Sequence, residues 1–165
     1  MAEFEDLQAD FSTHRIEGYS NHGHMKIDCP LITPVDDNLW QGGCIDGVSL
    51  GGHFKHVISL YPWERYTWKG MLDSFTEVKL YDSNNMPDLE QLDRLANWIN
   101  VCRRHGRTLV HCQAGLNRSA LLTALAIAKD EPETPMADIV TRLREKRSPV
   151  VLCNQTFERY LLDYR

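Results

Sequence analysis

The sequence lacks the features that mark membrane and secreted proteins. No apolar run approaches the roughly 20 residues that a helix needs to cross a bilayer. Residues 1–6 are acidic and lack the basic and then apolar order of a secretion signal. These absences argue against a membrane or secreted protein, so we expect a cytoplasmic location and no membrane partner.

The cysteine patterns of structural metal sites and disulfide frameworks are also missing. The five cysteines are odd in number and include no Cys-x-x-Cys pair, which favours reduced thiols. The histidine pair His22 and His24 has no third ligand at the usual zinc spacing. We therefore expect no metal and no other cofactor.

Positive charge is not in excess. The 18 lysines and arginines are outnumbered by 23 aspartates and glutamates, which gives a net charge of −5 at pH 7. This balance argues against broad binding to nucleic acids, although it leaves room for a local basic pocket.

The composition that is present fits one globular domain. The chain has 165 residues, of which 42% are hydrophobic and 25% charged, and it contains no internal repeat or low-complexity tract. Residues 1–28 are polar and show no sustained period, so we expect a loosely docked N-terminal arm there. The folded domain is expected over residues 29–165.

Short apolar runs alternate with amphipathic segments along this domain. Strands are expected at residues 32–43 (two strands around a turn), 55–60, 77–81 and 108–111. Helices are expected from Pro87-Asp88 to Gly106, over residues 119–128, from a Thr134 cap to Ser148, and after an Asn154 cap. This alternation predicts an α/β fold with a central, mostly parallel, twisted sheet flanked by helices.

One nine-residue stretch carries most of the chemical information. It runs from His111 to Ser119, reads His-Cys-Gln-Ala-Gly-Leu-Asn-Arg-Ser, and joins an expected strand to an expected helix. Converging N–H groups and the helix dipole make such a loop an anion site. That setting lowers the pKa of Cys112 and makes its thiolate a nucleophile. Arg118 can hold two phosphate oxygens with its planar, charged fork, so the stretch predicts a phosphate held against a sulfur.

The stretch resembles the signature of the cysteine-dependent protein tyrosine phosphatase superfamily, which is His-Cys, five residues, Arg and then Ser or Thr. The short chain and the strand pair at residues 32–43 look like the dual-specificity phosphatase branch, and the resemblance covers about residues 30–163. It implies a phosphatase catalytic domain over residues 29–165. It also implies a phosphate-binding loop that includes His111, Gln113, Ala114, Gly115, Leu116 and Asn117.

The resemblance also implies a general acid, an aspartate that follows a strand about thirty residues before the cysteine. Asp82 occupies that place, and a positioned acid contributes typically about 10²–10⁴-fold to a rate. The surrounding Asp-Ser-Asn-Asn is also good turn chemistry, so a structural turn is the other interpretation, with Asp88 in reserve. Ser119 is implied to hydrogen-bond the sulfur and help it leave, and it can cap the helix as well. His111 is implied to orient the loop.

The substrate is a phosphorylated protein under this interpretation. The uncharged loop residues disfavour a highly anionic phosphoinositide, whereas Asn117 before the arginine is similar to RNA 5′-triphosphatases of the same superfamily. Possible substrate contacts are Trp63, Arg65, Tyr66 and Arg147. Trp63 and Tyr66 can instead pack on the core, and a basic helix end such as that around Arg147 is usually a solvated face.

We expect a protein phosphatase, monomeric, that hydrolyses phosphotyrosine and also phosphoserine or phosphothreonine through a cysteinyl-phosphate. The alternatives are an RNA 5′-triphosphatase and a non-catalytic phosphoprotein-binding module. The sequence leaves open which cysteine, if any, pairs with Cys112 in a regulatory disulfide: Cys29, Cys44, Cys102 or Cys153.

Overall fold

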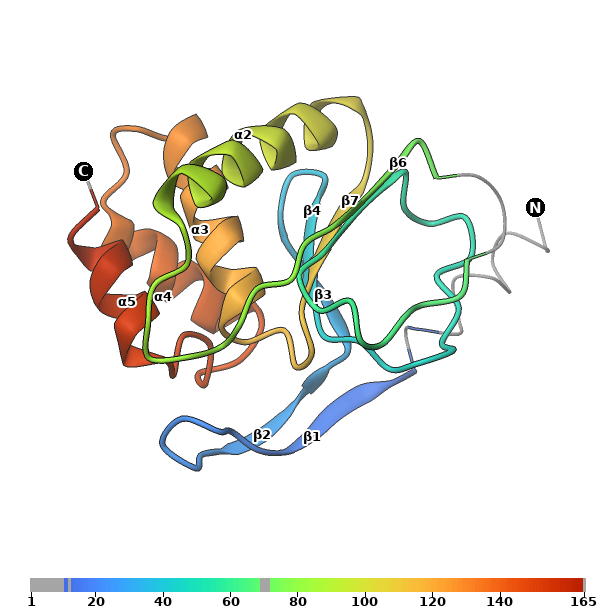
Figure 1. Ribbon diagram of the computed structural model, residues 1–165, viewed down its shortest axis with the longest axis horizontal. Coiled ribbons are helices and arrows are strands. Elements are labelled where there is room, and N and C mark those ends of the chain that lie inside the picture. The colour runs from blue at the N-terminus through green and yellow to red at the C-terminus, as the bar shows by residue number, and fades with distance from the viewer. Residues whose placement is uncertain (1–10, 12, 69–71, 165) are drawn as a thin grey trace.

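A five-stranded sheet forms the centre of the computed structural model, which describes residues 11, 13–68 and 72–164 (Figure 1). Its strands are β3 (Ile32–Asp36), β4 (Leu39–Gly42), β5 (His56–Ser59), β6 (Ser74–Glu77) and β7 (Thr108–His111), in the order β3-β4-β7-β5-β6. Only the β3–β4 pair is antiparallel. The predicted mostly parallel sheet is confirmed.

The described part of the chain contains the helices α2 (Leu89–His105), α3 (Arg118–Asp130), α4 (Met136–Lys146) and α5 (Gln155–Leu162). They gather together in Figure 1, and α3 contacts each of the other three. Along β5 and β7, Ile58 and Val110 belong to the core shared with the helices. Val57 and Leu109 belong to a second core, formed largely with loop residues such as Phe54 and Tyr66. Helices therefore cover one face of the sheet, and non-helical segments of the described chain cover much of the other.

Several expected ends of elements agree with the structure. Asp88 begins α2 by accepting a hydrogen bond from the Glu90 N–H, and Gly106 follows its last residue. The Asn154 side chain accepts from the Thr156 and Phe157 N–H groups at the start of α5. The expected Thr134 cap of α4 is wrong, because its hydroxyl donates to Glu131 instead and the helix begins after Pro135.

The strand expected at residues 77–81 lies earlier in the chain, at Ser74–Glu77. Its partner β5 ends at Ser59, which is in register with Glu77, and the last bond of this ladder joins the Val78 N–H to the Ser59 carbonyl. Beyond that point β5 has ended, so residues 79–81 have no β5 residue to pair with. The alternation of polar and apolar residues at 77–81 therefore reflects an extended segment that leads out of the sheet.

The N-terminal segment differs most from expectation. Residues Arg15–Tyr19 (β1) and Lys26–Pro30 (β2) form an antiparallel two-stranded hairpin outside the main sheet. The boundary expected after residue 28 thus falls inside β2. Residues 1–10 and 12 of the expected arm lie outside the described residues. Ile27 and Cys29 are buried on one side of the hairpin, which docks it against the domain.

Among the described residues, no helix combines the length and apolar character that crossing a bilayer requires.

Candidate active site

The loop between β7 and α3 lies at the carboxyl end of the central strand, where ligands of parallel sheets usually bind. Cys112 directly follows β7, and Arg118 is the first residue of α3. A cavity of about 310 Å³ opens above them, and Asp82 and Asn117 also line it. The structure thus brings the expected nucleophile, arginine and acid to one cavity, together with Asn117 of the expected loop.

The loop is shaped from behind by bonds to its carbonyl groups. The Cys44 N–H donates to the Gln113 carbonyl, and Gln41 Nε2 donates to that of Gly115. Arg147 also binds the Gly115 carbonyl through Nε, at 2.7 Å, and the Ala114 carbonyl through a terminal nitrogen, at 3.0 Å. With these carbonyls held, the Gly115 N–H is directed toward the Cys112 sulfur.

Gly115 has a left-handed φ of 73° and packs directly against the end of β4. A Cβ atom there would lie 2.4 Å from the carbonyl carbon of Gly42. Only glycine combines this conformation with so close an approach, so the glycine of the motif fixes how tightly the loop closes.

The environment of Cys112 favours a thiolate. Burial alone would raise the pKa of this thiol, but the Arg118 charge, the Ser119 hydroxyl and the N–H groups of Ser119 and Gly115 outweigh it and lower the pKa. The Cys112 sulfur lies 3.4 Å from Ser119 Oγ, which can donate to the ionised form. The loop therefore provides a buried nucleophile together with donors for an anion.

Among the described residues, Arg118 is held at one end of its guanidinium group. One terminal nitrogen donates to the Leu80 carbonyl at 3.0 Å, and the guanidinium lies over the Tyr61 ring, 5.1 Å from its centroid. The Nε atom is buried and has no hydrogen-bond partner in the described part of the chain. A buried donor without a partner is costly, and an oxyanion in the adjoining cavity would satisfy it.

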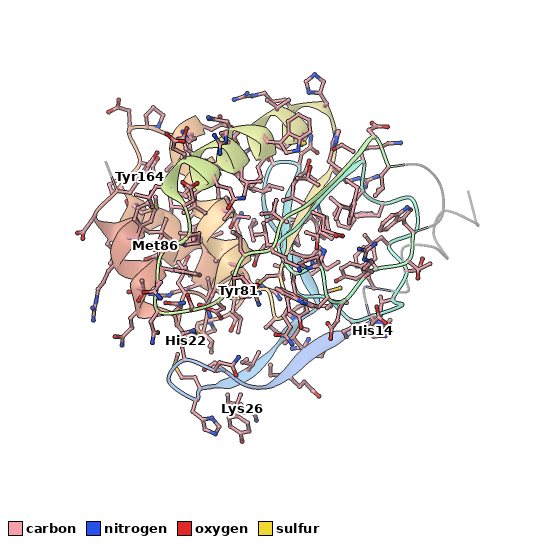
Figure 2. All side chains as sticks on the ribbon, viewed as in Figure 1. His14, His22, Lys26, Tyr81, Met86 and Tyr164 are labelled. Carbon is pink, nitrogen blue, oxygen red and sulfur yellow. The ribbon has the colours of Figure 1, made fainter. Side chains whose placement is uncertain are left out.

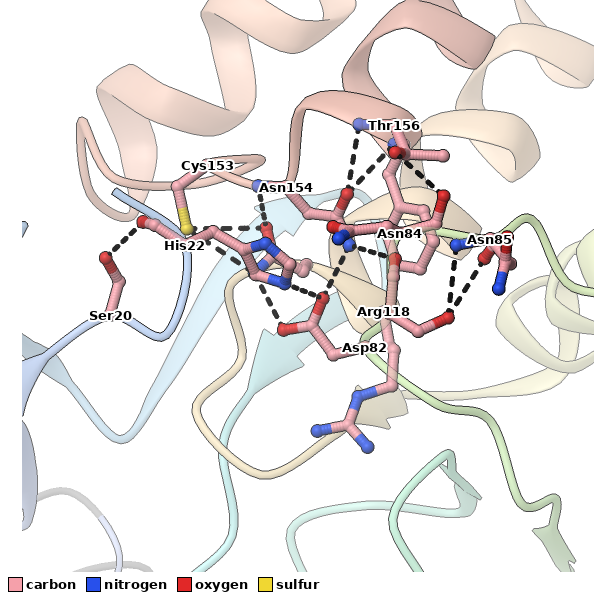
Figure 3. Close-up of polar contacts among 12 residues, drawn as sticks. Ser20, His22, Asp82, Asn84, Asn85, Arg118, Cys153, Asn154 and Thr156 are labelled. Carbon is pink, nitrogen blue, oxygen red and sulfur yellow. Dashed lines mark hydrogen bonds and ion pairs between the residues drawn. The ribbon is translucent and has the colours of Figure 1, made fainter. Parts of the chain in front are cut away.

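Asp82 lines the same cavity and lies at the end of the extended segment after β6 (Figure 3). Its Oδ2 accepts from Asn117 Nδ2 at 2.9 Å, and its Oδ1 accepts from Asn154 Nδ2 at 2.7 Å. His22 Nε2 lies 3.0 Å from the same Oδ1. The carboxyl group is thus fixed from the loop, from the start of α5 and from the hairpin.

Comparison with known proteins agrees with this geometry. Residues 50–165 match the family model described as dual specificity phosphatase, catalytic domain. The chain belongs to this family. It is therefore a protein phosphatase of the dual-specificity class.

The relatives include a dual specificity protein phosphatase of vaccinia virus, strain Copenhagen, which is 26% identical over 85% of this chain and 88% of its own length. Human dual specificity protein phosphatase 14 is 35% identical over 54% of this chain and 45% of its own length. The solved structure of a mouse putative dual specificity phosphatase complexed with zinc tungstate has a TM-score of 0.64. It is 16% identical and covers 80% of this chain and 84% of its own.

The structure argues against two of the expected substrate contacts of the phosphatase. Tyr66 is 5% exposed, and its hydroxyl donates to the Gly43 carbonyl at 2.5 Å, so it packs under the loop instead of facing a ligand. Arg147 is also 5% exposed, and beyond its loop contacts it donates to the Pro30 carbonyl and Thr33 Oγ1. Its charge is committed to the protein's own carbonyls.

The other expected contacts remain at the surface. Arg65 is paired with Glu77 at 3.1 Å. Trp63 is 47% exposed and lies against two tyrosine rings, with centroids 4.9 Å from Tyr61 and 5.7 Å from Tyr81. Because Tyr61 also contacts the Arg118 guanidinium, this aromatic group begins at the phosphate-binding residues.

His111 is built into the support of the phosphatase loop. Its ring is buried, and burial lowers its pKa to about 4, so it is neutral at pH 7. Its Nδ1 lies 3.2 Å from the Cys112 carbonyl, which can only accept, so Nδ1 carries the proton. Among the remaining loop residues, Gln113, Ala114 and Leu116 line the cavity.

The other cysteines are free thiols in this structure. Cys44 lines the same cavity as Cys112, but burial, with the charges of Glu64 and Asp46, raises its pKa to about 12. Burial also raises the pKa of Cys29 and of Cys102. The sulfur nucleophile favoured by its surroundings is therefore Cys112.

Sequence reasoning missed two partners of Asp82 and one of Arg118. Asn154 gave a signal only as a helix cap, and Tyr61 gave none. His22 is 60 positions from Asp82 along the chain. Its only signal was a histidine in a polar segment, which does not predict a contact.

Proposed function

We propose that this phosphatase prefers phosphotyrosine and acts through a cysteinyl-phosphate formed on Cys112. The observation that carries the proposal is the pairing of a buried Cys112 of lowered pKa with a buried Arg118 Nε that has no partner among the described residues. The Cys112 sulfur attacks phosphorus, and the Arg118 Nε–H group donates a hydrogen bond to a phosphate oxygen.

The reaction has two steps. Cys112 Sγ attacks phosphorus in line while Arg118 and the loop N–H groups hold the equatorial oxygens. Asp82 gives a proton to the leaving oxygen as its bond to phosphorus breaks. A water molecule then attacks the phosphocysteine, its proton passes to Asp82, and the sulfur leaves as a thiolate to which Ser119 Oγ donates.

The surface around the cavity supports an aryl phosphate on a protein. The exposed ring of Trp63, flanked by Tyr61 and Tyr81, offers a wall against which a phosphotyrosine ring can pack. Phosphoserine and phosphothreonine would gain less from this wall, so we rank them second.

The alternative of an RNA 5′-triphosphatase loses its main support. Asn117 is the residue that resembled that branch, but here its amide donates to Asp82 and its carbonyl oxygen accepts from the Asn154 N–H. Glu17 and Glu64 line the cavity and would repel a triphosphate. We rank RNA hydrolysis below protein dephosphorylation, and the retained Cys112, Arg118 and Asp82 place a non-catalytic module below both.

A reducing compartment fits a chain whose described cysteines are free and whose nucleophilic Cys112 has a lowered pKa, so we propose a cytoplasmic location. We also propose that the phosphatase is a monomer. We propose that it needs no metal, because Arg118 and the loop N–H groups already supply positive charge at the phosphate site.

The first test compares the protein with Cys112→Ser. We expect the variant to keep its fold and its affinity for phosphate but to lose turnover of an aryl phosphate, since serine is far less acidic than the Cys112 thiol. The same assay, run at one salt concentration, compares kcat/KM for phosphotyrosine peptides, phosphoserine peptides and triphosphorylated RNA. Residual turnover by Cys112→Ser contradicts the covalent mechanism. A higher kcat/KM for RNA than for every phosphopeptide reverses the ranking.

A further inference from the structure

The tip of the β1–β2 hairpin touches the proposed general acid. His22 lies in the turn between the two strands, and its Nε2 is 3.0 Å from Asp82 Oδ1 (Figure 3). Both side chains are 19% exposed, so the contact is largely shielded from water. In Figure 2, His22 lies on the side of the hairpin that faces the body of the protein, whereas Lys26 lies on the far side.

The turn that carries His22 is well ordered by its own bonds. The Ser20 N–H donates to the Met25 carbonyl, which closes the turn, and the Met25 N–H donates back to Ser20 Oγ. Ser20 Oγ in turn donates to the His22 carbonyl at 2.6 Å. Ser20 is buried, so these bonds are protected. The backbone of His22 is therefore held in place before its ring meets Asp82.

The three partners of Asp82 differ in origin. Asn117 belongs to the phosphate-binding loop, and Asn154 caps α5, so both are parts of the packed domain. Among the described residues, His22 is the partner of Asp82 that the β1–β2 hairpin supplies. The hairpin also contributes Ile16, Glu17 and Ile27 to the lining of the cavity. The hairpin thus forms one wall of the site and contacts the acid at its tip.

We propose that His22 is a positioning residue that holds the Asp82 carboxyl group in the orientation needed for proton transfer. The inference rests on the proposed role of Asp82 as the general acid. Without His22, Oδ1 keeps its bond to Asn154, but the carboxyl group loses the restraint that the hairpin supplies. His22 takes no part in the proton balance, because the proton that Asp82 gives to the leaving group is replaced by one from the attacking water.

The test uses the leaving group as its readout. An acidic phenol leaves without a proton, whereas a tyrosine side chain needs one. In His22→Ala we expect kcat/KM, which reports phosphoenzyme formation, to fall roughly tenfold for a phosphotyrosine peptide, about the effect of losing one hydrogen bond. The kcat/KM for para-nitrophenyl phosphate should change by less than about twofold, because that leaving group barely uses the acid.

Three further variants give the comparison its controls. His24→Ala removes a histidine from the same turn that stacks on Tyr19 and has no contact with Asp82, so neither rate should change. His22→Gln keeps an N–H donor at similar reach and should recover most of the lost rate. Ser20→Ala leaves the ring in place but loosens the turn, and we expect a smaller loss with the same dependence on leaving group.

Asp82→Asn separates this inference from the proposed function. If Asp82→Asn shows no dependence on leaving group, Asp82 is not the acid and both proposals fall. If Asp82→Asn shows the dependence and His22→Ala does not, only the role of His22 is overturned. An equal loss on both substrates in His22→Ala, or a failure of His22→Gln to recover the rate, also overturns it.

Discussion

Arg147 shapes the phosphate-binding loop from behind, although its own side chain is buried. Its guanidinium is buried, and it donates to the carbonyl groups of Pro30, Leu31, Ala114 and Gly115 and to Thr33 Oγ1. These bonds join the phosphate-binding loop to the end of β2 and the start of β3. The basic character that suggested a substrate contact in the sequence is used inside the protein.

We predict that Arg147→Met is strongly destabilising. Each buried carbonyl left without a donor costs about 1–3 kcal/mol, so the free energy of unfolding should fall by about 3 kcal/mol or more. Urea unfolding measures this loss. The exposed Arg159, whose guanidinium bonds only Gln155, provides the control, and Arg159→Met should change stability by less than about 0.5 kcal/mol. Equal stability of the two variants would contradict the role assigned to Arg147.

The residues of the site differ in whether a local motif, a family resemblance or only the folded structure reveals them. Cys112, Gly115 and Arg118 follow one another in a short motif whose spacing carries the chemistry. Asp82 needed the family resemblance, because its local sequence equally suits a turn. His22 and Arg147 act across 60 and 32 positions of sequence, to Asp82 and Gly115 respectively. Only the packing of elements brings them together, and no local pattern encodes that packing.

At the scale of elements, the start of α5 joins helix capping to the site. Asn154 Oδ1 accepts from the Thr156 and Phe157 N–H groups, while its Nδ2 donates to Asp82 and to the Ser83 carbonyl. One side chain thus begins a helix and restrains the proposed acid.

Two substitutions should separate these roles of Asn154. Asn154→Ala removes the cap and should lower the free energy of unfolding by about 1 kcal/mol, while Asn154→Ser retains an oxygen that caps the helix. Both variants lack the amide Nδ2 that donates to Asp82, so both should slow phosphotyrosine hydrolysis more than para-nitrophenyl phosphate hydrolysis. Thermal unfolding measures the first effect, and kcat/KM for the two substrates, which reports phosphoenzyme formation, measures the second. A serine variant with full activity on both substrates would show that the Asn154 amide does not restrain the acid.

Elements with strong end signals were predictable from sequence. β7 lies where its apolar run indicated, and Asp88, Gly106 and Asn154 mark helix ends as expected. The strand at residues 74–77 was misplaced because pairing with β5, and not alternation, sets its limits. The β1–β2 hairpin was missed because most of its residues are exposed, which leaves no continuous apolar pattern.

For the molecule as a whole, two buried histidines predict how stability depends on pH. His53 lies among the rings of Phe11, Trp40 and Phe54, and neither of its ring nitrogens has a partner in the described chain. Burial, with a smaller effect of Arg107, lowers its pKa from 6.5 to about 4. Burial lowers the pKa of His111 to the same range.

In the unfolded chain these histidines take up protons near their ordinary pKa, whereas in the folded chain they resist until about pH 4. The unfolded state therefore binds more protons below about pH 6.5, and we predict that stability falls as the pH drops from 6.5 toward 4. Each histidine adds a slope of up to about 1.4 kcal/mol per pH unit.

Urea unfolding at a series of pH values measures this slope. His53→Phe, which suits the aromatic surroundings, should reduce it, whereas His24→Phe on the hairpin turn should leave it unchanged. An unaltered slope in His53→Phe would contradict the assignment.

The parallel pairing of β4 with β7 also has a consequence for how the chain folds. Leu39 is in register with Thr108, so the two strands that frame the loop come from distant parts of the sequence. Pairings of such long sequence separation form slowly, because loop-closure entropy is lost before the contacts are gained. Gly42 and Gly43, which back the loop, reach it only through this pairing. A partly folded chain therefore has no phosphate site, and the nascent protein cannot act on substrates before its central strands have met.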